Sequence, residues 1–187
     1  MKRILPVVLV FCLLVGGCKG SDDGLSKALQ LRSQLLDSNG CSFRSIVTAD
    51  YGDKTYTFSM QCQADRVGKL SFSVIEPDSI SGITGFISGD GGKLTFDDKA
   101  LTFPLIADGE VSPVSAPWLL VKTLLGGYIS SGSFDGEYYL ISIDDSYEED
   151  ALQLDIWLNN ENVPVASDVL WQGRRVLSIQ IEEFTIV

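Results

Sequence analysis

The side chains that could carry out chemistry in this sequence are few, and cysteine is the type whose positions point to a specific reaction. Histidine is absent from all 187 residues, which removes the usual general base, the usual zinc ligand and any serine–histidine or cysteine–histidine pair. Neither a Ser-x-x-Lys nor a Gly-x-Ser-x-Gly motif occurs, and no cysteines have metal-ligand spacing. We therefore expect no enzymatic activity, no metal and no cofactor other than a covalent group.

Cys18 lies where an apolar run ends and an acidic segment begins. The run follows a basic pair and is shorter than the roughly 20 residues that a membrane-spanning helix needs, which is typical of a secretory signal. Val15-Gly16-Gly17-Cys18 resembles the bacterial lipobox, in which the cysteine sulfur receives a diacylglyceryl group before cleavage. By that resemblance residues 1–17 are a lipoprotein signal peptide, and Cys18 becomes the first mature residue, carrying acyl chains such as palmitate. The alternative is an ordinary signal peptide with an incidental cysteine.

The charge of the mature chain limits its partners. Loss of residues 1–17 leaves 12 basic and 25 acidic residues, a formal charge of −13. Such a field repels nucleic-acid phosphates and anionic lipid surfaces. We expect the protein on the extracytoplasmic face of a bacterial membrane, held there by the lipid on Cys18, with no nucleic-acid partner.

Cys41 and Cys62 are the other cysteines of the mature chain, and they flank the turn-like Tyr51-Gly52-Asp53. Antiparallel folding about that turn places Cys41 opposite Cys62, or one pair away on the same face. An opposed pair is close enough for a disulfide, whereas a diagonal pair at ~7–8 Å is too far apart. An exported pair of cysteines favours a disulfide, and two buried free thiols are the alternative.

The periodicity predicts a helix and then many strands. After a polar lipidated tether over residues 18–24, apolar residues recur on one broad helical face over 25–38, where Arg32 interrupts the face and is expected to snorkel. After Gly40 the apolar period changes to two, as in antiparallel strands with one buried face. The predicted strands are 41–50, 54–62, 70–74, 94–96, 101–105, 128–133, 137–143, 152–158, 163–171 and 174–186.

A second helix is predicted inside the sheet. Trp118 to Leu125 is almost wholly apolar and lies between two prolines and Gly126-Gly127, which suit a helix entrance and stop. A short helix that is apolar on nearly every side must be covered. Residues 25–187 are therefore expected to form one mainly β domain of the α+β class. In it, an antiparallel sheet of about ten strands curls around a helix in its concave face.

The order of these elements, with Glu76-Pro77, GGKLTFDDKALTFPL and VLWQGRRVLSIQIEEF, resembles the LolA and LolB superfamily of bacterial lipoprotein localisation factors. The resemblance covers most of residues 25–187. It implies an unclosed antiparallel β-barrel whose hollow is lidded by helices and receives acyl chains. The shuttling carrier of that superfamily is unanchored, unlike a chain with Cys18. The sequence is also similar to LolA-like lipoproteins of Gram-positive bacteria, including spore germination lipoproteins.

Within such a half-barrel, an empty hollow and a hollow filled by the inner helix are both open. The residues expected to line it are Phe58, Met60, Phe72, Val74, Leu94, Phe96 and Trp118. The leading hypothesis is a non-catalytic, membrane-anchored protein that binds an acyl chain or a partner's hydrophobic segment. The alternative is a structural or interaction lipoprotein of an envelope or spore germination assembly. The acidic run over 144–150 favours a solvated loop over a calcium site.

Overall fold

The fold is one bent antiparallel sheet with two helices. The computed structural model describes residues 20–52, 54–104, 106–107 and 110–187, so the predicted signal peptide and the predicted lipid site Cys18 lie outside the described residues. Eleven strands form the sheet in the order β6-β5-β4-β3-β2-β1-β13-β12-β11-β10-β9, and β7 and β8 form a separate two-stranded ribbon. The strands are β1 (Gly40–Asp50), β2 (Thr55–Asp65), β3 (Leu70–Glu76), β4 (Thr84–Ser88), β5 (Gly91–Phe96), β6 (Lys99–Phe103), β7 (Ile106–Ala107), β8 (Glu110–Val111), β9 (Tyr128–Asp135), β10 (Tyr138–Asp144), β11 (Leu152–Leu158), β12 (Pro164–Trp171) and β13 (Arg174–Ile186).

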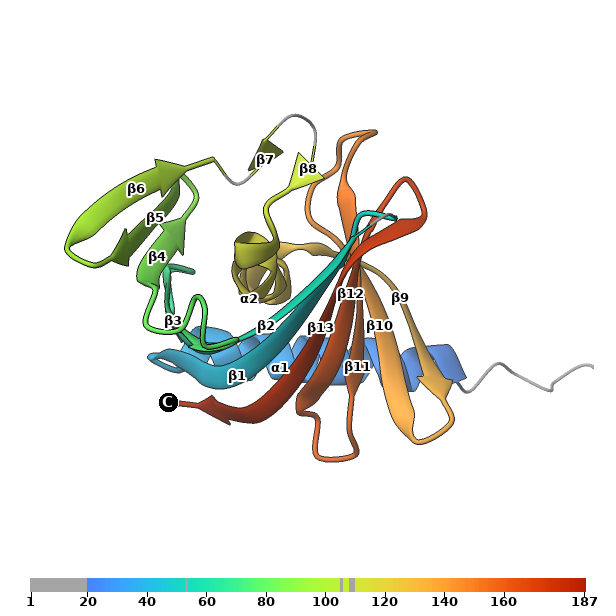
Figure 1. Ribbon diagram of the computed structural model, residues 1–187. Helices are drawn as coiled ribbons and strands as arrows, with labels where there is room; N and C mark the ends of the chain where they lie inside the picture. Colours follow the sequence, from blue (N-terminus) through green and yellow to red (C-terminus); the bar gives the residue numbers. More distant parts are fainter. Residues whose placement is uncertain (1–19, 53, 105, 108–109) are drawn as a thin grey trace, which may run out of the picture.

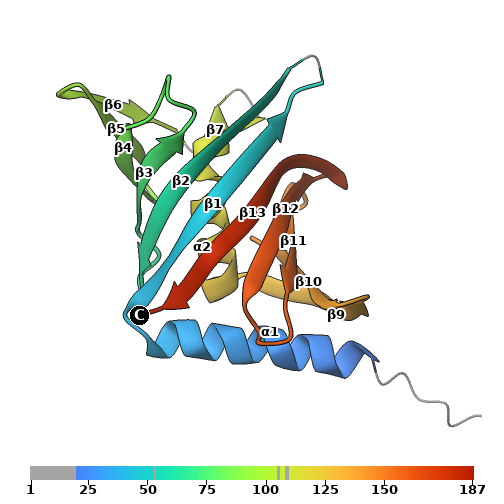
Figure 2. The same cartoon turned by 60° about the horizontal axis from the view of Figure 1, so that its bottom comes forward.

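The sheet is strongly curved but does not close into a barrel. Its first and last strands, β6 and β9, are the two edges and do not pair with each other. Figures 1 and 2 show the sheet bending around α2, with the edge strands β6 and β9 apart from each other. The predicted class, a mainly β unclosed half-barrel with two helices, is confirmed.

Strict alternation of side chains gives the sheet its two faces. Along β11 the residues from Leu152 to Leu158 alternate between buried and half-buried positions, and β1 shows the same period. The side chains on the concave face form one cluster that also contains residues of both helices. The core therefore lies inside the curve of the sheet, as the period of two predicts.

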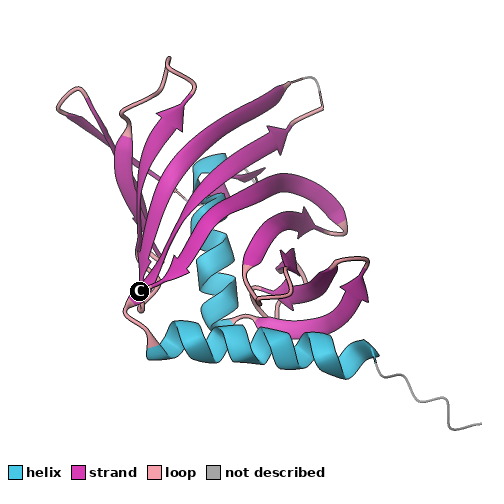
Figure 3. Ribbon diagram, turned by 90° about the horizontal axis from the view of Figure 1, so that it is seen from below, coloured by secondary structure: helices cyan, strands magenta, loops and turns pink. Residues whose placement is uncertain are grey.

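Helix α1 (Gly20–Asp37) crosses one end of the half-barrel (Figures 2 and 3). It begins five residues before the expected start at Leu25, so the segment expected as a tether is helical from Gly20 on. Packing explains the extension, because a Cβ on Gly24 would lie 2.7 Å from the backbone carbon of Gly132 in β9. Two glycines thus let helix and strand approach closely, and tertiary packing of this kind extends a helix beyond its intrinsic tendency.

Helix α2 (Ala116–Gly126) lies in the concave face of the sheet, as predicted (Figure 3). A short 3₁₀ turn (Pro113–Ser115) precedes it, Pro117 occupies its first turn, and the backbone N–H of Gly127 caps it by donating to Thr123 O. Eight of its eleven residues are buried, and Lys122 is exposed. The helix therefore occupies much of the hollow around which the sheet curves.

Strand β4 is the strand of the main sheet that periodicity failed to predict. Its five residues include Gly85, and the alternation is weak there. The glycine is required, because a Cβ at this position would collide with the backbone oxygen of Lys93 in β5 and would lie 2.7 Å from the ring of Phe72 in the neighbouring strand β3. The ring of Phe72 fills the space that a side chain at Gly85 would otherwise occupy. The apolar alternation is therefore absent from the sequence of β4.

Candidate binding site

Helix α2 is held at its carboxyl end by a side chain from α1. Arg32 donates hydrogen bonds to Leu124 O at 2.7 Å, Gly127 O at 2.8 Å and Thr123 O at 3.2 Å. A cation at the carboxyl end of a helix satisfies carbonyl groups that lack helical partners and opposes the helix dipole. Burial lowers the pKa of Arg32 from its usual value. The predicted snorkelling of Arg32 is wrong: its head group turns into the protein and joins the two helices.

The amino end of α2 is held by Trp118. The indole Nε1 of Trp118 donates to Gly68 O, in the turn between β2 and β3, at 2.8 Å. The side chain is 5% exposed, so this bond gives its buried polar group a partner. With Arg32 at the other end, both ends of α2 are fixed to different parts of the half-barrel.

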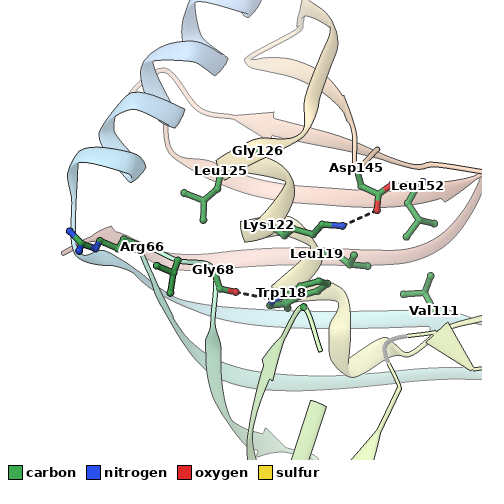
Figure 4. Close-up of a pocket in the computed structure, with 12 residues that line it drawn as sticks. Arg66, Gly68, Val111, Trp118, Leu119, Lys122, Leu125, Gly126, Asp145 and Leu152 are labelled. Atoms are coloured by element: carbon green, nitrogen blue, oxygen red, sulfur yellow. Dashed lines mark hydrogen bonds and ion pairs between the residues drawn. The ribbon is translucent and has the colours of Figure 1, made fainter. Parts of the chain in front are cut away.

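A pocket of about 610 Å³ opens beside α2, and we call it the Trp118 pocket (Figure 4). It lies between α2 and the parts of the chain that carry Gly68, Val111 and Leu152. Its apolar lining consists of Val67, Val111, Trp118, Leu119, Leu125 and Leu152. This wall suits an aliphatic or aromatic group.

One ion pair lies in the wall of the Trp118 pocket. Lys122 Nζ is 3.2 Å from Asp145 Oδ2 and lies 5.5 Å from the centre of the Trp118 ring. The other carboxylate oxygen of Asp145 accepts a hydrogen bond from the backbone N–H of Leu152 at 2.9 Å. The pair offers polar contacts without adding net charge to the wall, and Arg66 is the other charged residue of the lining.

A second pocket, of about 540 Å³, adjoins the first, and we call it the Trp171 pocket. The two pockets share Val111 and Leu152 in their linings. Apolar side chains of the Trp171 pocket include Trp171, Val176 and Leu177, while Asp50 and Arg174 bring charge to it. The two pockets therefore lie on either side of shared residues, between α2 and the turns joining β1 to β2 and β12 to β13, and we call the pair of pockets the recess.

Trp118 is the one predicted lining residue that borders either of these two pockets. Four others, Phe58, Met60, Phe72 and Val74, are at most 9% exposed and belong to the cluster that packs against α2. Leu94 is partly buried against the same cluster, whereas Phe96 is 51% exposed at the end of β5, beside the edge strand. Because the first four belong to the cluster that contains α2, and Leu94 packs against it, α2 occupies the space in front of them, whereas Phe96 lies outside that cluster.

Sequence reasoning missed Val111, Leu119 and Leu152 as lining residues. Leu119 and Leu152 sit in segments that were predicted as a buried helix and a strand. Nothing local distinguishes them from core residues, because only the packing of α2 against the sheet leaves their surfaces open to a pocket. Val111 lies in the short ribbon β7–β8, which carries no periodic pattern.

Cys41 and Cys62 are buried free thiols in the structure. Cys41 pairs with Ala64, and Cys62 pairs with Phe43, so the two cysteines are one pair out of register on the same face. A diagonal of this kind is too long for a disulfide without backbone movement. The structure has no bond between the two sulfurs, and the disulfide stays a prediction. Burial raises the pKa of each thiol to about 12.

The acidic run follows β10 and is organised by backbone contacts. Within the described residues, no group of three or more potential metal-ligating side chains is close enough to hold a metal ion. Asp145 is committed to Lys122 and to the backbone of Leu152. Glu148, Glu149 and Asp150 are exposed, as in a solvated loop. None of the described helices is long and apolar enough to cross a membrane.

The fold and pockets together describe a half-barrel with a helix in its hollow and an apolar recess beside that helix. No protein-family model and no curated protein matches the sequence. Similar solved structures include a LolA superfamily protein from Nitrosomonas europaea, at 10% identity and TM-score 0.45, covering 86% of this chain and 93% of that one. A DUF1329 family protein from Desulfovibrio piger aligns at 8% identity and TM-score 0.47, covering 88% and 92%.

A third similar structure is a chain from the complex of the CwlD amidase with the GerS lipoprotein of Clostridioides difficile. It aligns at 11% identity and TM-score 0.43, covering 91% of this chain and 99% of that one. These names agree with the resemblance inferred from the sequence. At such identities and TM-scores the similarity is one of backbone fold, and it establishes neither family membership nor function.

Proposed function

We propose that this chain is a lipid-anchored extracytoplasmic protein that binds an apolar group, such as an acyl chain or a partner's hydrophobic segment, without catalysis. The observation that carries the proposal is the recess formed where the Trp118 and Trp171 pockets meet at Val111 and Leu152. Each pocket has a volume in the range of roughly 300–1,000 Å³ that is usual for small-molecule sites. A linear apolar group fits two adjoining pockets better than a compact one does.

The lining supports an apolar ligand with at most a small polar end. Leu119, Leu125 and Leu152 supply aliphatic wall, and Trp118 supplies a flat aromatic surface whose only polar group is already bonded to Gly68. Lys122 is paired with Asp145, so a carboxylate or phosphate ligand would have to compete with that side chain there, and Arg66 is the other cation of the lining. The anchor at Cys18, expected from the lipobox, would keep this recess at a membrane surface.

A fluorescent fatty acid tests the proposal with purified full-length protein. Val111→Trp fills the junction of the two pockets with a larger ring, and Val187→Trp makes the same change at a residue that is 54% exposed. We expect the first change to weaken probe binding by about tenfold or more, equivalent to ~1.4 kcal/mol, and the second to leave it unchanged. Equal affinity in both variants would show that the recess is not the site.

A second function is favoured by the position of α2. The helix fills much of the hollow and is fixed at both ends, by Arg32 and by Trp118. A filled hollow suits a structural or interaction lipoprotein of an envelope or spore germination assembly, working through its edges or acidic outer face. That function predicts no binding of the fatty-acid probe, together with slow hydrogen exchange throughout α2.

A further inference from the structure

Helix α1 carries a row of exposed leucines that the protein itself does not cover. Leu25 is 42% exposed, Leu29 is 51% exposed and Leu36 is 53% exposed. At 100° per residue these positions fall within about 40° of one another around the helix axis, along about 16 Å of its length. We call these three residues the leucine row. Sequence periodicity assigns them to one broad apolar face with the core residues, but the structure buries only part of that face.

The inner face of α1 is firmly packed, so the leucine row belongs to a fixed element. Ala28, Leu31 and Leu35 are at most 2% exposed. Gly24 meets the backbone of Gly132, and Asn162 Nδ2 donates to Lys27 O at 3.1 Å. The helix cannot roll to bury the leucine row without losing these contacts. The leucine row can therefore be shielded from water only by a surface outside this chain's own fold.

The exposed residues between the leucines of the row are uncharged, and the exposed carboxylates of α1, Asp23 and Asp37, flank the row at its two ends. Ser26, Gln30, Ser33 and Gln34 are the other exposed residues between Leu25 and Leu36. The charged residues of this stretch turn elsewhere: Lys27 lies over the ring of Tyr139, and Arg32 caps α2. The leucine row can therefore approach a bilayer of neutral lipids without direct repulsion, whereas the formal charge of −13 of the mature chain disfavours an anionic one.

The position of the predicted anchor selects the occupant. The described chain begins with α1 at Gly20, two residues after Cys18 in the sequence (Figure 2). One residue, Lys19, lies between them, and two residue steps span at most about 7 Å, so lipid chains on Cys18 would bring the amino end of α1 to the headgroup level. An apolar helix face held at that depth is covered by lipid and leaves contact with water.

We propose that the leucine row of α1 lies against the lipid bilayer and orients the half-barrel on the membrane. The proposal rests on the lipid anchor of the proposed function, because three leucines without basic neighbours hold a protein to a bilayer only when a lipid chain adds to them. It does not depend on what the recess binds. With α1 on the membrane, the turn between β1 and β2 points away from it (Figure 2).

Single-cysteine labelling tests the orientation in the lipidated full-length protein. An environment-sensitive fluorophore is attached at Leu29→Cys in the leucine row or, as the control, at Thr55→Cys, which is exposed at the far end of β1 and β2. Cys41 and Cys62 are buried and do not compete for the label in the native protein. Both proteins are placed in phosphatidylcholine vesicles, with and without lipids that carry a nitroxide quencher in their acyl chains.

We expect the label at residue 29 to shift to shorter wavelength and to lose most of its emission with the nitroxide lipids, while the label at residue 55 keeps both. Equal responses at the two positions overturn the proposal. A shift at residue 29 without quenching also overturns it and indicates a protein partner, including a second copy of this chain. The intact mass is measured first, and absence of lipid on Cys18 refutes both this proposal and the anchor, whatever the fatty-acid probe shows.

Discussion

Arg32→Met tests whether the bonds between α1 and α2 stabilise the position of the inner helix. Methionine keeps an unbranched apolar stem but removes the guanidinium that donates to Leu124 O, Gly127 O and Thr123 O. Hydrogen bonds from charged donors contribute about 1.5–3 kcal/mol each. Counting the two short bonds at the lower value, because the site is half-buried, gives a loss of roughly 3 kcal/mol.

The measurement combines urea unfolding with hydrogen exchange of α2. If the lost free energy is local to α2, its carboxyl-terminal amides exchange about 100-fold faster, since 1.4 kcal/mol corresponds to a factor of ten. Arg32→Lys restores the charge without the planar set of donors and should recover part of the loss. The matched control is Arg175→Met, which removes an arginine whose side chain is 65% exposed and which pairs with Asp168 at 3.3 Å. That change should cost at most about 1 kcal/mol. A loss for Arg32→Met no larger than the control's would refute the reasoning.

Two further predictions concern the packing of α1 and the buried thiols. Gly132→Ala should destabilise the fold by about 1–3 kcal/mol in urea unfolding, because the new Cβ would lie 2.7 Å from the backbone of Gly24. Gly126→Ala, whose Cβ meets nothing within 4 Å, should leave stability within about 0.5 kcal/mol, and equal effects would exclude the close contact. Burial raises the pKa of Cys41 and Cys62 to about 12, so the contribution of these thiols to stability should be constant below pH ~8.5 and fall as the pH rises from there toward 12, because in that range the unfolded thiols ionise and the folded ones do not. A thiol reagent at pH 8 should modify neither cysteine in the native protein and both in denaturant; absence of thiols in denaturant would indicate that the predicted disulfide forms.

Much of the fold follows from periodicity, because each strand has one buried face. The last predicted strand, 174–186, and the strand 152–158 agree with β13 and β11 to the residue. The inner helix is predictable for a related reason, since a short apolar helix between prolines and glycines has no stable place except inside the sheet. Strand β4 was not predicted, because the ring of Phe72 from the neighbouring strand occupies the place of a side chain at Gly85. That contact arises only in the folded structure and leaves no pattern in the local sequence.

The candidate site was less predictable than the fold. A concave face can be read from alternation, but a pocket is the part of that face which α2 leaves uncovered. Phe58 and Leu152 look alike in sequence, as apolar residues in alternating strands. Phe58 packs in the core cluster and Leu152 borders two pockets. The same limit applies to Arg32, whose partners are backbone carbonyls more than 90 residues away.

The two proposed functions differ in what α2 must do, and its contacts show where that difference would arise. Hydrogen bonds hold α2 at its two ends, from Trp118 to Gly68 O and from Arg32 to Leu124 O. The Trp118 pocket lies along the side of the helix. A ligand in the recess therefore needs no displacement of α2, and binding is compatible with a filled hollow as long as the ligand stays in the two pockets. A bulkier apolar group would have to displace α2 and break the hydrogen bonds at one of its ends. Because Arg32→Met removes the bonds at the carboxyl end beforehand, this variant should bind such a group more tightly. If Arg32→Met leaves the affinity of every apolar probe unchanged, α2 is a permanent part of the core and the recess alone sets the size of the ligand.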